Sequence, residues 1–375
     1  MIKRIIETQI GEHFGKQKAI LLFGARQVGK TTLLENCDLL KAVKTLFLSG
    51  DETDIKEILS NTTSMRLEHL FSGYDTVVID EAQEIENIGT TIKLITDKLK
   101  HIQLIATGSS AFELANRTSE PLTGRKYEFM LFPLSFSEMV THHGFLTETR
   151  LLDVRLIFGY YPEIVTKAGE EVKHLKLIAN SYLYKDLLRL DTLRRTDLLE
   201  KILKALALQI GNEVNYSELA QLCNTDSKTI ERYIDLMVKA YIIFILPAYN
   251  KNVRNEIKKG KKIYFWDNGI RNAIIGNYNQ VVAQRTDIGQ LWENFLVSER
   301  AKNNCYAQRN AKSYFWRTTQ QQEIDYIEEE NDSFVTYEFK WKTTSKPKLP
   351  NTFASSYKVS DFKVISPANI EEFLL

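Results

Sequence analysis

The stretch Gly24-Ala-Arg-Gln-Val-Gly-Lys-Thr-Thr32 completes the pattern G-x-x-x-x-G-K-[ST] directly after the apolar run 19–23. A strand, a glycine-rich loop and a helix in this order are typical of a phosphate-binding loop. Two glycines let backbone N–H groups approach phosphate oxygens, and the helix presents the positive end of its dipole to the anion. The pattern therefore predicts a nucleoside triphosphate site. The alternative is a glycine-rich turn that only joins a strand to a helix.

The residue types in this loop predict how the nucleotide is held. Lys30 supplies a mobile positive charge for the β- and γ-phosphates, and Thr31 supplies a hydroxyl ligand for Mg²⁺. ATP and Mg²⁺ are therefore the expected cofactors. The expected nucleotide contacts are Gly24, Ala25, Arg26, Gln27, Val28, Gly29, Lys30, Thr31 and Thr32.

A second motif follows about fifty residues later, where the Val- and Ile-rich run 75–80 ends in Asp80 and Glu81. A buried parallel strand that ends in carboxylates points them toward the crevice in which nucleotides bind. This is typical of a Walker B motif, in which Asp80 would hold the Mg²⁺ shell and Glu81 would act as the general base for the attacking water. The alternative is an acidic helix start, with Glu81 and Glu84 favoured by the helix dipole.

Two further groups are candidates for contact with the γ-phosphate. The strand 101–106 ends in Thr107 and Ser109, whose hydroxyls we interpret as sensors of the phosphate or of the lytic water; the alternative is ordinary turn and capping chemistry. Arg125, in a Thr-Gly-Arg turn, is a candidate arginine finger for its own chain or a neighbouring one. The alternative is a surface arginine that pairs with a nearby acid.

Strand and helix patterns alternate from about residue 18 to 165, which predicts an α/β fold with helices on both faces of a parallel sheet. Ser135 and Glu138 have the spacing of a capping box and predict a helix start at Ser135. The expected strands are 19–23, 45–48, 75–80, 102–106 and 127–132.

The composition of the chain limits the number of domains and the kinds of partner that we expect. A chain of 375 residues favours two or three domains, and a net charge of +1 leaves nucleic-acid binding to local clusters. Three widely spaced cysteines, Cys37, Cys223 and Cys305, favour reduced thiols and a cytoplasmic location. His142-His143 has no companion with zinc-ligand spacing, and no apolar stretch is long enough to span a bilayer, so neither a zinc site nor a membrane partner is expected.

The motifs together resemble a prokaryotic family of AAA+-type ATPases whose C-terminal half is of unknown function. The resemblance rests on segments 24–33, 77–83, 106–110, 122–125, 133–138 and 159–163. In the last of these the family usually has Gly-Gly-x-Pro, and this chain has Tyr160 in place of the second glycine. The resemblance implies a P-loop ATPase core followed by additional domains.

The middle of the chain is expected to be helical. Residues 170–195 are interpreted as a lid or linker, and three helices, ending with one that starts at Ser227, precede a strand pair. This is the order of a winged-helix unit. The candidate DNA contacts on its third helix are Ser227, Lys228, Thr229 and Arg232, and a basic run, Lys251, Arg254, Lys258, Lys259, Lys261 and Lys262, lies in the expected wing. A module for packing or protein contact is the alternative.

The last third alternates between helix and strand again and resembles the PD-(D/E)XK nuclease superfamily. Glu293 on a helix, Asp325 on a strand, and Glu338 and Lys340 two residues apart on the next strand stand at the positions of that motif. Carboxylates and a lysine gathered in this way can hold a divalent metal and a polarised water against a phosphodiester. A surface salt-bridge ladder across the strands would give the same residues.

The sequence therefore predicts an α/β protein with a P-loop NTPase parallel sheet, a helical lid, a winged-helix unit and a smaller nuclease-like α/β domain. The expected parts are residues 1–165, 166–198, 199–265 and 266–375. The predicted function is a Mg²⁺-dependent ATPase coupled to a C-terminal half that acts on or near DNA. Two alternatives stay open: an ATP-controlled switch that binds a protein partner, and an ATP-gated metal-dependent nuclease. An oligomer is also possible.

Overall fold

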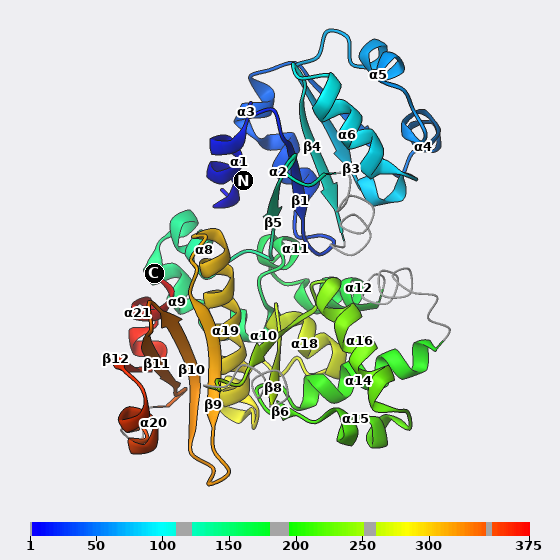
Figure 1. The fold of residues 1–375 in the computed structure, drawn as a ribbon. Coiled ribbons are helices and arrows are strands. Elements are labelled where there is room, and N and C mark those ends of the chain that lie inside the picture. The colour runs from blue at the N-terminus through cyan, green and yellow to red at the C-terminus, as the bar shows by residue number, and fades with distance from the viewer. Residues whose placement is uncertain (1, 110–121, 181–194, 251–259, 343–346) are drawn as a thin grey trace. The chain divides into compact units, whose positions relative to one another are not determined.

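The computed structural model describes residues 2–109, 122–180, 195–250, 260–342 and 347–375. These residues form two compact units, of which the first contains the described part of 2–134 together with Lys239–Tyr241, and the second contains the other described residues (Figure 1). No helix in these ranges is both long enough and apolar enough to cross a lipid bilayer. The four-part division expected from the sequence remains a prediction.

The first unit is built on a five-stranded parallel sheet with the strand order β2-β3-β4-β1-β5, which confirms the predicted fold class. In such a sheet the carboxyl ends of all strands lie along one edge, where α/β proteins bind their ligands. The strands are β1 (Ala19–Phe23), β2 (Thr45–Ser49), β3 (Thr76–Asp80), β4 (Gln103–Gly108) and β5 (Lys126–Met130).

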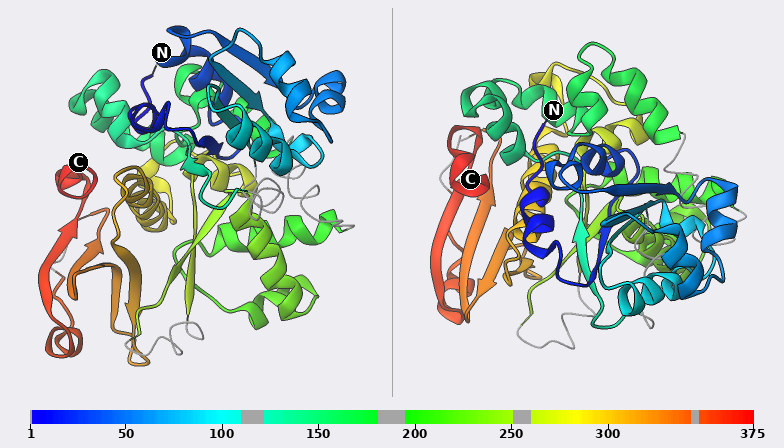
Figure 2. Two further views of the ribbon diagram at one scale, coloured as in Figure 1. Left: turned by 45° about the horizontal axis from the view of Figure 1, so that its top comes forward. Right: turned by 90° about the horizontal axis from the view of Figure 1, so that it is seen from above.

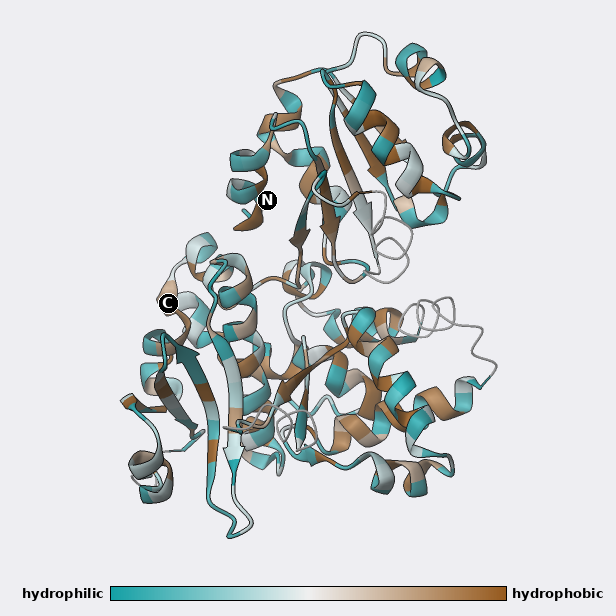
Figure 3. Cartoon of the chain, viewed as in Figure 1, coloured by the Kyte–Doolittle hydropathy of each residue, from teal (hydrophilic) through white to brown (hydrophobic). Residues whose placement is uncertain are grey.

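The central strands are continuous apolar runs because helices cover the sheet. All residues of β1 and β4 are buried, and Figure 3 shows hydrophobic residues along the length of β1. Leu21, Val77 and Leu104 belong to one core cluster with residues of α6. The helices of this unit are α1 (Ile6–His13), α2 (Lys30–Asn36), α3 (Asp38–Lys41), α4 (Thr53–Leu59), α5 (Ser64–Leu70) and α6 (Ile88–Lys98), with a short 3₁₀ turn η1 (Ala82–Glu84).

The second unit begins with the helix predicted from the capping box. Ser135 Oγ accepts a hydrogen bond from Glu138 N at 3.2 Å, and Glu138 Oε2 accepts one from Ser135 N at 2.9 Å, so the two side chains satisfy each other's backbone donors. The helices in this part are α8 (Phe136–His143), α9 (Phe145–Arg150), α10 (Leu152–Phe158), α11 (Pro162–Thr166) and α12 (Glu171–Ile178). The rest of the expected lid, residues 181–194, lies outside the described residues.

Three helices and a small antiparallel sheet follow. The helices are α14 (Thr196–Leu208), α15 (Tyr216–Cys223) and α16 (Ser227–Lys239), and the strands are β6 (Glu213–Val214), β7 (Ile243–Pro247) and β8 (Lys261–Phe265), paired in the order β6-β8-β7. The predicted second and third helices and the strand pair are therefore present. Lys251, Arg254, Lys258 and Lys259 of the expected basic wing lie outside the described residues.

The C-terminal region is a mixed four-stranded sheet in the order β12-β11-β10-β9, in which only the β11–β12 pair is parallel. Helix α19 packs beside this sheet and also contacts β8 (Figures 1 and 2). The elements are α18 (Asn268–Ile275), η3 (Val282–Gln284), α19 (Ile288–Tyr306), β9 (Lys312–Arg317), β10 (Glu323–Glu330), β11 (Ser333–Phe339), α20 (Asn351–Ser356), β12 (Val359–Ile365), η4 (Pro367–Asn369) and α21 (Glu371–Leu374).

The turn after α10 depends on a residue without a side chain. Gly159 has φ 74° and ψ −158°, a conformation that essentially only glycine adopts. A Cβ atom at this position would lie 2.0 Å from Asp267 Oδ1. Asp267 cannot move away, because its carboxylate accepts hydrogen bonds from Tyr160 N at 2.6 Å and Ile270 N at 3.1 Å and thereby caps α18.

We predict that Gly159→Ala destabilises the second unit strongly. The backbone strain costs about 1–3 kcal/mol, and the steric conflict with Asp267 adds about 1–3 kcal/mol. The matched control is Gly276→Ala, since Gly276 also has positive φ (69°) but a methyl group there would meet no described atom within 4 Å beyond its chain neighbours. Thermal and denaturant unfolding would measure both. Equal losses in the two variants would show that Asp267 yields to the methyl group.

Candidate functional site

The loop between β1 and α2 has the geometry of a phosphate cradle. Gly29 precedes α2 with φ 95°, and a Cβ atom on Gly24 would lie 2.1 Å from Leu131 O. Side chains are therefore unfavourable at both positions. Lys30 is 5% exposed, and its ammonium donates to Gly24 O at 2.8 Å and Ala25 O at 3.1 Å, so it lies inside the loop.

Asp80 connects the loop to the strand ends of the sheet. Its Oδ2 accepts a hydrogen bond from Thr31 Oγ1 at 2.7 Å, and its Oδ1 accepts one from Thr107 Oγ1. Thr107 Oγ1 in turn accepts from Glu81 N at 3.1 Å. Three segments that are far apart in the sequence therefore meet at one carboxylate, at the carboxyl edge of the sheet. The hydroxyl and the carboxylate predicted to hold Mg²⁺ are in direct contact.

The predicted base and the predicted sensor are joined by a residue that the sequence did not single out. Gln83 is 3% exposed, and its Nε2 donates to Glu81 Oε2 at 2.5 Å and to Ser109 Oγ at 3.2 Å. Glu81 has φ 48°, a left-handed conformation that is unusual for a residue with a side chain and often marks a functional site. The Glu81 carboxylate is thus held by Gln83 of η1, while the Glu81 backbone N–H is held by Thr107 of β4.

Arg125 lies at the other edge of this sheet. It directly precedes β5, whose first residue pairs with Ala19 at the start of β1, whereas the phosphate loop follows the end of β1. Its Nε forms an ion pair with Asp97 Oδ1 at 2.6 Å. This position does not fit contact with a phosphate at the loop of the same chain and agrees with the alternative of a paired surface arginine. A role toward a neighbouring chain remains a prediction.

The four candidate DNA contacts lie at the start of α16 and differ in their surroundings. Lys228 and Arg232 are exposed. The hydroxyls of Ser227 and Thr229 make local contacts, with Ser217 Oγ at 3.3 Å and with Asp226 Oδ2 at 2.7 Å, respectively. The two long cations are therefore the exposed members of the four candidates.

The candidate nuclease-like residues are brought together by α19, β10 and β11. Lys340 Nζ lies 2.7 Å from Glu338 Oε1, and Asp325 Oδ2 accepts a hydrogen bond from Phe339 N at 2.8 Å. Glu293 Oε1 lies 2.9 Å from the ammonium of Lys262 and 2.6 Å from the hydroxyl of Tyr264, both on β8. Within the described ranges, no three Asp, Glu, His or Cys side chains are arranged to hold a metal ion.

The pKa shifts show that these residues share one electrostatic environment. Burial, followed by the charges of Glu293 and Glu338, raises the pKa of Asp325 to about 8. Burial alone would lower the pKa of Lys262, but the carboxylates of Glu293, Glu323 and Asp325 raise it above its usual value. Lys262 was expected to be a surface cation of a basic wing; it is instead 2% exposed and paired, which corrects that expectation.

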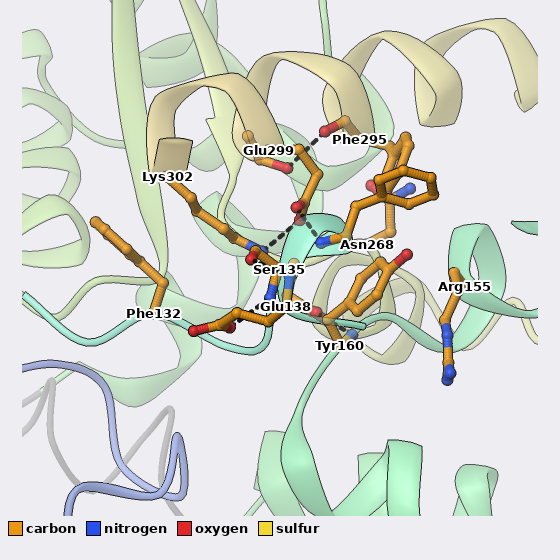
Figure 4. Close-up of polar contacts among 12 residues, drawn as sticks. Phe132, Ser135, Glu138, Arg155, Tyr160, Asn268, Phe295, Glu299 and Lys302 are labelled. Atoms are coloured by element: carbon orange, nitrogen blue, oxygen red, sulfur yellow. Dashed lines mark hydrogen bonds and ion pairs between the residues drawn. The ribbon is translucent and has the colours of Figure 1, made fainter. Parts of the chain in front are cut away.

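A second buried polar network lies around the Gly159 turn (Figure 4). Glu299 Oε1 accepts a hydrogen bond from Lys302 Nζ at 2.6 Å, and Glu299 Oε2 accepts one from Phe136 N at 2.6 Å. Burial raises the pKa of Glu299. The adjoining cavity, which Tyr160 also lines, has a volume of about 10 Å³, enough for roughly one water molecule. This cavity is too small for a substrate. The hydrogen bonds of Glu299 instead connect α8 to α19.

Sequence reasoning missed the parts that Gln83, Lys262, Tyr264 and Glu323 play in these clusters. A signal existed for Gln83, because it stands two residues after Glu81 in a motif that had already been singled out. Strand periodicity puts Lys262 and Tyr264 on one face of β8, but a local pattern does not reveal which other segment that face meets.

We predict that Asp325→Asn changes how stability depends on pH. The pKa of the Asp325 carboxyl in the folded protein, about 8, is raised above its unfolded value near 4. The stability that the protonated carboxyl contributes is thus fully present below pH ~4 and is lost as the pH rises through about 8. An asparagine can still accept the Phe339 N–H bond but does not ionise.

The melting temperature of Asp325→Asn relative to wild type should therefore rise between pH 5 and pH 8, by an amount equivalent to at least about 1 kcal/mol. The exposed Asp332→Asn is the control and should show no such trend. Parallel pH profiles for Asp325→Asn and wild type would contradict the raised pKa.

Family models match three consecutive parts of the chain: an AAA domain at residues 16–140, a domain of unknown function (DUF8612) at 149–281 and a domain of unknown function (DUF4143) at 288–369. An uncharacterized protein of Mycobacterium tuberculosis is 25% identical over 342 residues, which cover 90% of this chain and 73% of the relative. An uncharacterized protein of Haemophilus influenzae is 25% identical over 248 residues, covering 63% of this chain and 60% of the relative.

Among solved structures, a Walker-type ATPase of Pyrococcus abyssi is similar with a TM-score of 0.50 and 16% identity, covering 73% of this chain and 96% of that chain. At this identity the likeness bears on the fold alone. The parallel sheet, the phosphate loop and the match to the AAA domain agree with one another. Residues 16–140 therefore match the AAA domain model, and their parallel sheet has the P-loop NTPase fold.

Proposed function

We propose that this protein binds ATP with Mg²⁺ and hydrolyses it at the carboxyl edge of the parallel sheet. The observation that carries the proposal is the contact between Thr31 and Asp80, at 2.7 Å, beside the buried ammonium of Lys30. These three groups come from the two motifs that P-loop NTPases use for the phosphates and the metal. Their convergence supports a nucleotide site over a simple turn.

The donor set at this edge suits Mg²⁺. The metal prefers oxygen ligands and usually keeps several waters, so one hydroxyl, one carboxylate and the substrate phosphates can hold it. Thr31 and Asp80 would be its protein ligands, and the bound ion would neutralise charge that develops on the phosphates. Lys30 would bind the phosphate oxygens, and the loop N–H groups would orient them.

In this proposal Glu81 positions and deprotonates the attacking water. Gln83 holds the Glu81 carboxylate through its amide N–H, and Ser109 contacts the same amide group. Gln83 therefore orients the base and connects it to Ser109, the residue that follows β4, while Thr107 of β4 binds Asp80. A change in the γ-phosphate sensed at Ser109 or Thr107 would reach Glu81 through these contacts.

We predict that Lys30→Ala and Glu81→Gln both abolish Mg²⁺-dependent phosphate release. Lys30→Ala should weaken ATP binding because it removes the buried cation. Glu81→Gln should still bind ATP but lose about 10²–10⁴ in turnover, as expected when a general base is removed. Phosphate release and binding of a fluorescent ATP analogue would measure the two effects separately.

Glu86→Gln is the matched control, since Glu86 is an exposed carboxylate five residues beyond Glu81 and should leave turnover unchanged. If the Glu81→Gln variant hydrolyses ATP as fast as wild type, Glu81 is not the general base. Absence of saturable ATP binding by the wild-type protein would end the proposal as a whole.

We further propose that the nucleotide state is coupled to the C-terminal half and that this half acts on or near DNA. The support is the order of elements α14, β6, α15, α16, β7 and β8, which is the order of a winged-helix unit, and the exposure of Lys228 and Arg232 at the start of α16. That position is where recognition helices contact the groove or the phosphates.

We predict that a Lys228→Ala, Arg232→Ala double variant weakens binding to duplex DNA. Each lost phosphate contact should flatten the slope of log K against log salt concentration by about 1, so the pair should flatten it by about 2. Fluorescence anisotropy across a salt series would measure this. The charge-matched control is Lys201→Ala, Lys204→Ala, which removes two exposed cations from α14.

Equal loss in the two double variants would contradict a specific role for α16. If the wild-type protein has no measurable DNA affinity, the ATP-controlled switch with a protein partner becomes the better proposal. The third candidate, an ATP-gated nuclease, depends on the carboxylate cluster of the C-terminal region.

A further inference from the structure

The carboxylate cluster of the C-terminal region already contains a cation, which comes from another part of the chain. Lys262 of β8 places its ammonium 2.9 Å from Glu293 Oε1 and 2.8 Å from Glu323 Oε1. Glu293 belongs to α19 and Glu323 to β10, so a single ammonium bridges the helix and the sheet. The charge of Asp325, on β10 as well, also acts on Lys262.

The position of this ammonium is fixed from several sides. Lys262 is 2% exposed, and its Nζ lies 5.3 Å from the centre of the Phe315 ring, a cation–π contact. Tyr264, two residues along the same strand, donates its hydroxyl to the Glu293 oxygen that Lys262 also contacts. Glu293 therefore has both of these β8 side chains as partners.

The cluster is supplied with positive charge by side chains of the protein. Among the described residues, its carboxyl groups are those of Glu293, Glu323, Asp325 and Glu338. Its cations there are Lys262, Lys340, 2.7 Å from Glu338, and Arg317, 3.9 Å from Glu323. These cations offset most of the carboxylate charge, which leaves little unbalanced charge to attract a divalent ion.

The arrangement does not fit the metal that the nuclease resemblance implies. Without a bound phosphate, a divalent ion would have to take its ligands at about 2.0–2.6 Å mainly from converging carboxylates, and among the described residues no three Asp, Glu, His or Cys side chains are so arranged. A metal bound by Glu293 would also lie within a few ångströms of the buried ammonium, where two positive charges repel each other strongly. The ammonium would have to leave before the metal could bind.

We infer that the ammonium of Lys262 is the resident cation of this cluster and takes the place of a divalent metal between Glu293 and β10. The C-terminal region is then a nuclease-like scaffold without a metal-dependent cleavage site. Lys262 also joins the small β6-β8-β7 sheet to α19 and β10 by an ionic contact, so it locks these two parts of the second unit together.

The test is Mn²⁺ binding in the absence of nucleotide, measured by calorimetry and by electron paramagnetic resonance of free Mn²⁺. Wild type and Asp325→Asn should give the same titration, because no site that uses Asp325 exists in wild type. Lys262→Met keeps the aliphatic length and removes the charge. It should gain one Mn²⁺ site, at least about tenfold tighter than any wild-type affinity for the cluster.

Two variants control this gain. Lys262→Met, Asp325→Asn should lose the new site, which would assign it to the cluster. Lys261→Met removes the neighbouring cation on β8, whose ammonium lies over the Tyr216 ring instead, and should gain no site. Lys262→Met should also melt lower than wild type by roughly 5 °C or more, because the carboxylates lose their partner, and Mn²⁺ should restore part of that loss.

The inference is overturned if wild-type protein binds Mn²⁺ in a manner that Asp325→Asn abolishes, or if wild type cleaves plasmid DNA with Mn²⁺ and Asp325→Asn does not. It is also overturned if Lys262→Met folds, as judged by circular dichroism, and gains no Mn²⁺ site. Should Lys262→Met fail to fold, the comparison of wild type with Asp325→Asn decides the question alone. None of these measurements depends on ATP hydrolysis.

Discussion

The first unit depends on one shared carboxylate. Asp80 binds Thr31 through one oxygen and Thr107 through the other, so a single side chain fixes the phosphate loop and the end of β4 against β3. A parallel sheet brings these strand ends to one edge, and the hydrogen bonds then set their relative positions within that edge. The left-handed backbone at Glu81 and the hydrogen bond from the Gln83 amide set the orientation of the neighbouring Glu81 carboxylate.

The core of the fold could be predicted because its signals are local. The apolar runs of β1, β3 and β4 are buried on both faces, and each can be recognised from five or six consecutive residues. The capping box at Ser135 likewise predicts a helix start from only four residues. The motifs of the candidate site named Thr31, Asp80 and Thr107, which the structure brings into contact, and the roles of these residues toward a nucleotide stay predictions. Arg125 shows the limit of such local prediction, because a turn sequence does not reveal at which end of the strands the turn lies. In the structure Arg125 directly precedes β5 and pairs with Asp97, away from the phosphate loop.

The C-terminal half shows why the same reasoning is weaker there. Strands β9, β10 and β11 were predicted by alternation, whereas β12 was not. Glu293, Asp325, Glu338 and Lys340 do share one electrostatic environment. What a cluster of carboxylates does, however, depends on the charge that faces it. That charge comes from Lys262, which the sequence grouped with surface cations. Its burial results from the packing of β8 against α19, a long-range contact that no local pattern specifies.

The alternation of side chains along β8 limits insertions and deletions in this strand. Successive residues of a strand point to opposite sides, so Lys262 and Tyr264 meet Glu293 while the Lys261 ammonium lies over the Tyr216 ring of α15. Inserting or deleting a single residue within β8 would exchange these two sides. Ile263 would then face the carboxylates, and a buried charge would be left facing the wrong neighbours. The exact count of residues in this strand is thus as constrained as the identity of the lysine itself.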